Sequence, residues 1–161
     1  MKILGKFPST RLRRVRNSDW VRRLISENNL SANDLILPIF LTEGKNKKEK
    51  IKTMPGIYRY SLDKLSGILD EAEKFKIPMI ALFPNTSNHQ RDHNGSEALN
   101  ENNLVCRAIK LIKKKYNKFG VMTDVALDPY TSHGHDGIIL NCKIDNDETC
   151  LLYTSPSPRD S

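Results

Sequence analysis

The stretch Ile77-Pro-Met-Ile-Ala-Leu-Phe83 decides the fold, because a short apolar run of this length is typical of a fully buried strand. Similar runs occupy residues 35–41 and 119–126. Between the runs, apolar residues recur at helical spacing over 62–72 and over 105–116. Strands that alternate with helices in this way predict parallel strands joined by right-handed crossovers. We therefore expect an α/β fold in the order strand, helix, strand, helix, strand.

The spacing of these units distinguishes two α/β architectures. A (β/α)8 TIM barrel allows about 30 residues per unit, whereas each unit here takes roughly 40 because the loops after the strands are enlarged. Such barrels carry their active sites in those loops. An open doubly wound sheet is the runner-up, but no GxGxxG or P-loop sequence follows a predicted strand. Three strands cannot close a barrel, so we predict the N-terminal part of a TIM barrel, truncated after about the third strand.

Several local signals refine this prediction. Pro38 lies within the first apolar run and argues against a central place in the sheet. Residues 42–60 are predicted to form a polar loop, and Ser61 is expected to cap the helix that follows it. Near the start of the chain, Ser18 or Asp19 is expected to cap a short helix.

The chain is predicted to have three parts. Residues 1–30 form an extended N-terminal arm with a short helix, and residues 31–149 form the partial barrel. Residues 150–161 have no apolar period and look like the translation of a sequencing adaptor, so we expect a non-native tail. A natural Ser/Pro-rich terminus is the alternative. The natural sequence is then expected to continue beyond Thr149, which makes this chain a fragment.

Composition indicates a soluble cytoplasmic protein. The hydrophobic content is 38%, the mean hydropathy is -0.53, and no apolar stretch approaches the ~20 residues of a membrane helix. The first residues lack the apolar segment of a secretory signal. Three cysteines without CxxC spacing argue against a disulfide framework or a zinc knuckle.

The net charge of +7 raises the alternative of a nucleic-acid-binding module. Basic residues cluster in three places, at 11–16, 45–52 and 110–115, and the first cluster contains Arg11, Arg13, Arg14 and Arg16. Because the clusters lie in three different contexts, a solvated surface with oligomer contacts is the preferred interpretation.

The segment 123–137 is the densest in chemistry. Asp124 ends the third predicted strand, where a carboxylate has no packing value and would face the barrel mouth; the alternative is an aspartate that caps the next loop. Asp128 and Asp136 follow in the same segment, together with His133 and His135. The His-Gly-His pair also allows a metal-dependent barrel hydrolase, but Pro129 and a turn separate it from the strand.

This segment resembles the active-site segment of 5-aminolevulinate dehydratases, also called porphobilinogen synthases. The supporting motifs agree in order, and the resemblance covers essentially residues 7–149: Arg11-Leu-Arg-Arg14, Leu35 to Phe40, Met54-Pro-Gly56, Ile80-Ala-Leu-Phe-Pro84, Gly95-Ser-Glu-Ala98, Asp124-Val-Ala-Leu-Asp-Pro-Tyr-Thr-Ser-His-Gly-His-Asp-Gly137 and Asn146-Asp-Glu-Thr149.

The resemblance implies a lyase that joins two molecules of 5-aminolevulinate into porphobilinogen on the route to haem. It implies a TIM barrel whose N-terminal arm embraces a neighbouring subunit, usually in a homo-octamer, with no nucleic acid and no membrane as partner. The two Schiff-base lysines of the family lie beyond residue 149, so this chain alone is expected to be inactive.

The resemblance also implies roles for site residues. Asp124 is carried over as the catalytic aspartate beside the substrate amine, where it would hold or relay protons. The active-site loop would contain the following residues: Asp128, Tyr130, Ser132, His133 and Asp136. The histidines are expected to shape this loop.

Metal use is expected to differ from the zinc-dependent members of the family. Ala126, Asp128 and Asp136 stand where those members carry three cysteines, so zinc affinity should largely be lost. The pattern matches the zinc-independent, aspartate-rich subgroup and allows magnesium in the full-length enzyme, with ligands outside this chain. Asp128 and Asp136 are candidate ligands for a cation, and pairing with a lysine or with the substrate amine is the alternative.

Overall fold

The computed structural model describes residues 5, 6, 8, 10 and 14–153. Arg11 and Arg13 of the predicted basic arm, and positions 154–161 of the predicted tail, lie outside the described residues. The chain divides into two compact units, residues 1–31 and 32–161. No helix in the described part is both long and apolar enough to cross a membrane.

The first unit contains the predicted short helix. After the 3-10 helix η1 (Arg14–Arg16), helix α1 (Asp19–Leu24) begins behind Ser18, which has extended backbone angles but makes no side-chain capping bond. Trp20 is 64% exposed and Leu24 is 76% exposed. The apolar side chains of α1 therefore have little cover within this unit.

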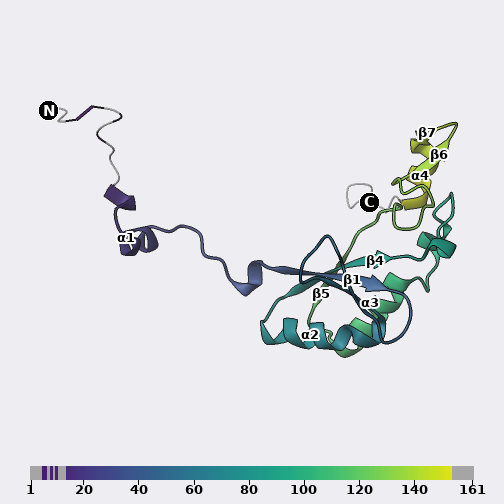
Figure 1. The fold of residues 1–161 in the computed structure, drawn as a ribbon, viewed down its shortest axis with the longest axis horizontal. Coiled ribbons are helices and arrows are strands. Elements are labelled where there is room, and N and C mark those ends of the chain that lie inside the picture. Colours follow the sequence, from purple (N-terminus) through teal and green to yellow (C-terminus); the bar gives the residue numbers. More distant parts are fainter. Residues whose placement is uncertain (1–4, 7, 9, 11–13, 154–161) are drawn as a thin grey trace, which may run out of the picture. The chain divides into compact units, whose positions relative to one another are not determined.

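The second unit is built on a five-stranded sheet in the order β2-β3-β1-β4-β5 (Figure 1). The three predicted strands are β1 (Ile36–Thr42), β4 (Met79–Asn85) and β5 (Gly120–Thr123). They are parallel: β1 pairs with β4 over seven residues, and β4 pairs with β5 over four. The predicted strand, helix, strand, helix, strand order is confirmed, although β5 ends at Thr123 and not at residue 126.

The prediction of a loop over 42–60 is wrong, because this segment contains two short strands. β2 (Lys48–Lys50) runs antiparallel to β3 (Tyr58–Tyr60), which pairs in parallel with β1. Each strand has three residues, too few to show an alternating pattern, and β2 is exposed and highly charged. Lys48 Nζ lies 4.6 Å from the centroid of the Tyr58 ring, so a cation–π contact joins the pair.

Pro38 is accommodated in β1 although β1 lies inside the sheet. It stands opposite Ala81 of β4, whereas the register of β3 with β1 contains only Phe40 and Leu41. Pro38 therefore has a described strand neighbour on one side only, and its missing N–H leaves no gap in the ladder with β3. The expectation that Pro38 excludes a central position for its strand is wrong, because β1 is the middle strand of the sheet.

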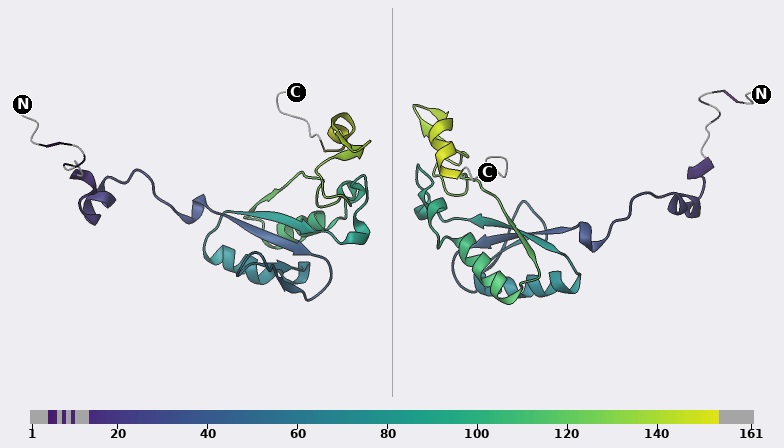
Figure 2. Two further views of the ribbon diagram at one scale, coloured as in Figure 1. Left: turned by 45° about the horizontal axis from the view of Figure 1, so that its top comes forward. Right: turned by 180° about the vertical axis from the view of Figure 1, so that it is seen from behind.

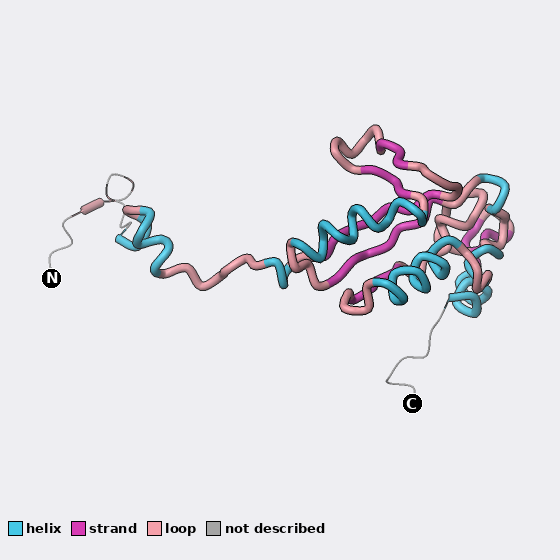
Figure 3. Tube along the Cα trace, turned by 90° about the horizontal axis from the view of Figure 1, so that it is seen from below, coloured by secondary structure: helices cyan, strands magenta, loops and turns pink. Residues whose placement is uncertain are grey.

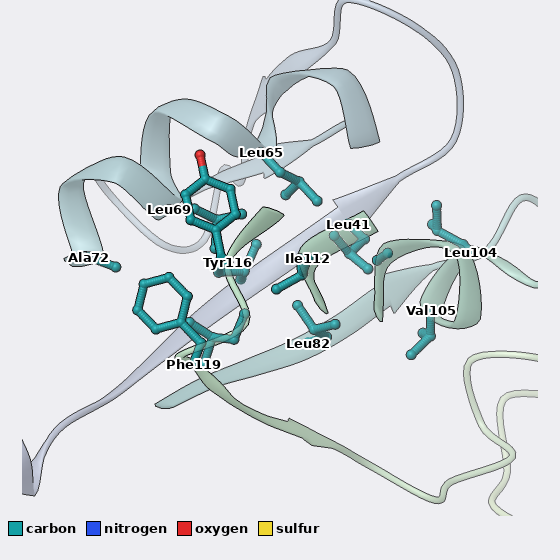
Figure 4. Close-up of a cluster of buried hydrophobic side chains, with 13 residues drawn as sticks. Leu41, Leu65, Leu69, Ala72, Leu82, Leu104, Val105, Ile112, Tyr116 and Phe119 are labelled. Atoms are coloured by element: carbon teal, nitrogen blue, oxygen red, sulfur yellow. The ribbon is translucent and has the colours of Figure 1, made fainter. Parts of the chain in front are cut away.

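Helices α2 (Leu65–Lys74) and α3 (Leu104–Lys115) cover one face of the sheet (Figures 1 and 3). Ile39, Leu41, Ile80 and Leu82 project from the strands into this layer, and the apolar stripes of both helices close over them (Figure 4). Of the predicted apolar positions, Leu62 and Ile109 are only partly buried, whereas six are buried: Leu65, Leu69, Ala72, Val105, Ile112 and Tyr116. This layer is the hydrophobic core.

Ser61 does not cap a helix with its side chain as predicted. It precedes the 3-10 helix η3 (Leu62–Lys64), but its fully buried hydroxyl accepts a hydrogen bond from the Lys47 amide at 2.9 Å. The hydroxyl also donates to the Lys47 carbonyl at 3.3 Å. Ser61 thus ties the end of β3 to the start of β2. At α3, Asn103 is the true capping residue, because its side chain accepts from the Cys106 amide at 2.8 Å.

The opposite face of the sheet carries no helix from the described residues. The register places Ile36, Met79 and Gly120 in one row on this face, and Pro38, Ala81 and Met122 in the next. Ile36 is 47% exposed and Met122 is 42% exposed. An apolar face left this open belongs to an incomplete layer, as expected for part of a barrel.

A small subdomain follows the sheet and was not predicted. β6 (Ile138–Leu140) and β7 (Lys143–Asp145) form a hairpin that leads into α4 (Asn146–Tyr153), and together they lie beyond the carboxyl ends of β1 and β4 (Figure 2). The remaining described elements are three 3-10 helices: η2 (Ala32–Asp34), η4 (Asn88–Gln90) and η5 (Ser96–Leu99). Helix α4 crosses the boundary at Thr149, so the non-native tail stays a prediction.

The two faces of the sheet predict opposite responses to truncation of a side chain. Leu82→Ala removes a residue that is 1% exposed in the core, and we expect it to lower the free energy of unfolding by about 2–5 kcal/mol. Met122→Ala on the helix-free face should cost less than about 1 kcal/mol. Urea unfolding followed by circular dichroism measures both, and equal losses would contradict the assignment of the core.

Candidate active site

The carboxyl ends of the strands enclose a cavity of about 210 Å³. Asp124, the first residue after β5, lines this cavity as predicted. Ala126, Asp128 and Tyr130 from the following loop also line it. The rest of the lining comes from other strand ends and the loop: Phe40, Arg59, Phe83, Pro84, Asn85 and Pro129. Three of the predicted site residues, Asp124, Asp128 and Tyr130, therefore line one cavity, whereas Ser132, His133 and Asp136 are not part of its lining.

Asp128 beside this cavity feels the negative charges of two other carboxylates. The pKa of Asp128 is raised above its ordinary value, first by partial removal from water and then by the negative charges of Asp136 and Asp124. Arg91 opposes this shift with its positive charge. Like charges held this close favour the uptake of a proton or the binding of a cation.

Asp136 has a structural bond within the loop. Its Oδ1 atom accepts a hydrogen bond from the Leu127 amide at 2.5 Å, and its side chain is not among those that line the cavity. This bond closes the loop over nine residues and draws Asp136 toward Asp128. Among the described residues, no group of three or more His, Cys, Asp or Glu is arranged to hold a metal ion.

Tyr130 gives the cavity a neutral hydrogen-bond donor. Burial raises the pKa of Tyr130 to about 12, with smaller contributions from Cys106 and Glu97. The phenol therefore keeps its proton at any physiological pH. Tyr130 also borders a second cavity, of about 300 Å³, between α3, the loop and Leu152 of α4. Asp124 lines both cavities.

The two predicted histidines lie in the loop, and His133 contacts both His135 and His93. His133 Nε2 is 3.2 Å from the His93 carbonyl oxygen, and His133 Nδ1 accepts from the His135 amide at 3.2 Å. The ring centroid of His133 is 5.2 Å from that of His93 and 5.7 Å from that of His135. Both ring nitrogens of His133 thus lie beside backbone groups, an arrangement that suits loop shape better than metal ligation. Ser132 is exposed, and its amide donates to the Asp92 carbonyl at 2.8 Å.

Sequence reasoning missed several residues of this site. Phe40 and Phe83 stack with ring centroids 5.5 Å apart, and they lie opposite each other near the carboxyl ends of β1 and β4, whose apolar character predicted only burial. Arg59 lies on β3, which was not predicted. Arg91 and Asp92 fall in the loop between β4 and α3, for which no site residue was predicted. Position in the sequence could have identified Phe40 and Phe83, because residues near the carboxyl ends of neighbouring parallel strands meet at one edge of the sheet.

Comparisons with known proteins agree on one family. The family model described as delta-aminolevulinic acid dehydratase matches residues 9–157. The delta-aminolevulinic acid dehydratase of Bradyrhizobium diazoefficiens is 53% identical over 142 residues, which are 88% of this chain and 40% of that protein. The protein of the same name from Methanothermus sociabilis is 46% identical over 153 residues, which are 93% of this chain and 46% of that protein.

A solved structure supports the same assignment. Delta-aminolevulinic acid dehydratase (porphobilinogen synthase) from Toxoplasma gondii ME49, in complex with the reaction product porphobilinogen, superposes with a TM-score of 0.84 at 34% identity. The match covers 89% of this chain and 41% of that one, and it confirms that the sheet resembles the N-terminal part of the barrel. The chain spans less than half the length of each of these proteins. Because the family model covers most of its residues, the chain belongs to the delta-aminolevulinic acid dehydratase family.

Proposed function

We propose that this chain is the first part of a porphobilinogen synthase, a lyase that condenses two 5-aminolevulinate molecules into porphobilinogen for tetrapyrrole synthesis. The observation that carries the proposal is the carboxylate-lined cavity at the carboxyl ends of the strands, within a chain of this family. The related structure from Toxoplasma gondii contains porphobilinogen. A nucleic-acid-binding module and a metal-dependent hydrolase are not favoured by these matches.

The cavity suits a substrate that carries an amine. Asp124 and Asp128 supply negative charge for an ammonium group, and the stacked rings of Phe40 and Phe83 supply an apolar wall for a carbon chain. Asp124 is the group proposed to hold or relay a proton beside the substrate amine. Tyr130 can donate a hydrogen bond from its neutral phenol.

The amines that would form Schiff bases come from elsewhere in the proposed enzyme. A lysine nucleophile must reach the substrate carbonyl as a neutral amine, which requires a lowered pKa in a desolvated site. No lysine among the described residues lines the 210 Å³ cavity. We therefore propose that the 161-residue chain alone does not turn over 5-aminolevulinate.

The donor set here does not fit a catalytic zinc ion. The three positions that correspond to the zinc-binding cysteines hold the methyl group of Ala126 and the carboxylates of Asp128 and Asp136. The Asp136 carboxylate already accepts a hydrogen bond from the Leu127 amide. Zinc prefers nitrogen and thiolate sulfur ligands in tetrahedral geometry. We assign no step to zinc, and we propose that any magnesium in the full-length enzyme is bound outside this chain.

Assembly and location are further parts of the proposal. The exposed Trp20 and Leu24 of α1 support an N-terminal arm that packs on another subunit, and an octamer is the proposed assembly. A cytoplasmic location is proposed together with it.

A chimera tests the proposed function. Residues 9–149 of this chain replace the matching part of the Bradyrhizobium diazoefficiens protein, to which the chain is 53% identical. We expect the chimera to form porphobilinogen, measured colorimetrically, and the 161-residue chain to form none. Asp124→Ala in the chimera should lower kcat by about 10²–10⁴-fold, because an acid–base group is lost.

Asp63→Ala is the matched control, since Asp63 accepts from the Asn46 amide and does not line the cavity. A folded chimera without activity, or product formed by the 161-residue chain, would contradict the proposal.

The raised pKa of Asp128 predicts a stabilising substitution. Because the folded chain holds this proton more tightly than the unfolded chain, the ionised carboxylate lowers stability at neutral pH, and the penalty disappears as pH falls toward the ordinary pKa. Asp128→Asn should therefore raise Tm at about pH 7, with no gain near about pH 4.

Asp63→Asn is the control of opposite sign. Hydrogen bonds from Ser61 and Asn46 lower the pKa of Asp63, so its carboxylate adds stability above the ordinary pKa and loses that effect on acidification. Thermal unfolding at both pH values gives the sign of the change in Tm for Asp128→Asn and for Asp63→Asn. A lower Tm for Asp128→Asn at neutral pH would contradict the prediction that the ionised Asp128 carboxylate lowers the stability of the folded chain.

A further inference from the structure

The loop after β4 pairs with the acidic loop after β5. Asp92 and Thr131 form an isolated parallel bridge between the two loops. The Asp92 amide donates to the Tyr130 carbonyl at 3.2 Å, and the Asp92 carbonyl accepts from the Ser132 amide at 2.8 Å. Two backbone bonds therefore fix the loops in register directly beside the candidate active site.

Asp92 also shapes the turn that presents this bridge. Its Oδ1 atom accepts from the Asn94 amide at 3.0 Å and from the Ser96 amide at 2.9 Å. A hydrogen bond from the Ser96 side chain, and then these backbone bonds, lower the pKa of Asp92, so the turn is built on the ionised form. The carboxylate thus keeps the backbone of residue 92 facing the other loop.

Gly95 gives this turn its left-handed backbone, next to Thr131 and Leu127 of the acidic loop. Gly95 has a φ of +64°, and a Cβ atom there would lie 3.4 Å from Thr131 Cγ2 and 3.5 Å from Leu127 Cδ2. The left-handed backbone favours glycine here, whereas the space around it would admit a Cβ atom at ordinary van der Waals distance. The β4 loop therefore touches the side chains, as well as the backbone, of the acidic loop.

Thr131 passes this constraint to the carboxylates. It is fully buried, and its hydroxyl donates to the His135 carbonyl at 2.9 Å. Its amide donates to the Leu127 carbonyl at 3.0 Å. The next residue after His135 is Asp136, whose carboxylate accepts from the Leu127 amide. A connected set of hydrogen bonds thus runs from Asp92 through Thr131 to Leu127 and His135, which are the neighbours in sequence of Asp128 and Asp136.

We propose that Asp92 and Thr131 are positioning residues, through which the loop after β4 holds Asp124, Asp128 and Asp136 together. They touch neither cavity, and they act on the carboxylates through the backbone of the acidic loop. Any effect of Asp92 and Thr131 on catalysis rests on the proposed function. Their effect on the position of the carboxylates does not depend on that function.

The Leu127 amide reports on this arrangement in the 161-residue chain. A short bond to a carboxylate moves an amide proton resonance downfield and slows its exchange with solvent. Thr131→Val keeps the buried volume but removes the hydroxyl donor, so we expect the Leu127 resonance to move upfield and its exchange to accelerate about tenfold or more. Asp92→Ala should do the same, whereas Asp92→Asn keeps an acceptor oxygen and should retain most of the wild-type signal.

Asp63→Ala is the matched control, because it removes a carboxylate that holds another loop through the Asn46 amide. It should leave the Leu127 signal unchanged. Unchanged Leu127 shift and exchange in Thr131→Val would overturn the proposal, as would equal effects of Asp92→Ala and Asp92→Asn. An inactive chimera with an intact Leu127 response would remove the proposed function and leave the positioning role standing.

Discussion

The parallel pairing of β1 with β4 is the contact on which the rest of the second unit depends. It aligns seven residue pairs from Ile36 with Met79 to Thr42 with Asn85. Its register sends Ile39, Leu41, Ile80 and Leu82 toward the helices, where burial of apolar area stabilises the layer. A shift by one residue would turn these side chains to the open face, so the core itself fixes the register.

The same pairing decides where the chemistry lies. Parallel strands bring their carboxyl ends to one edge, and the two long loops that leave β4 and β5 must then run side by side. Asp92 and Thr131 join these loops, and Asp124 meets Asp128 at the edge. Apolar packing between strands and helices therefore positions polar groups that make no contribution to that packing.

Sequence patterns predicted those parts of the fold whose stability comes from long apolar repeats. The runs that became β1, β4 and β5, and the stripes of α2 and α3, are long enough for periodicity to identify them. β2, β3, β6 and β7 have three residues each and are specified by their neighbours. The predictions for Pro38 and Ser61 were wrong because local preference does not reveal tertiary pairing. Pro38 is tolerated because β3 pairs with β1 only at Phe40 and Leu41, and the Ser61 hydroxyl is bound by the Lys47 amide. In the candidate site, the acidic segment was evident in the sequence. Arg59 and Asp92 were not, because their importance comes from strand pairing and loop pairing.

The acidic cluster is unfavourable for folding and is therefore informative about function. Asp128 is held near Asp124 and Asp136 at the expense of a raised pKa, and Arg91 only partly compensates for the repulsion. A chain selected for stability alone would separate these charges or neutralise them. The structure does the reverse, because the Leu127 amide and the bridge to Asp92 hold the loop closed around them. Repulsion of this kind is relieved when a cation binds, which agrees with the ammonium group proposed for the substrate.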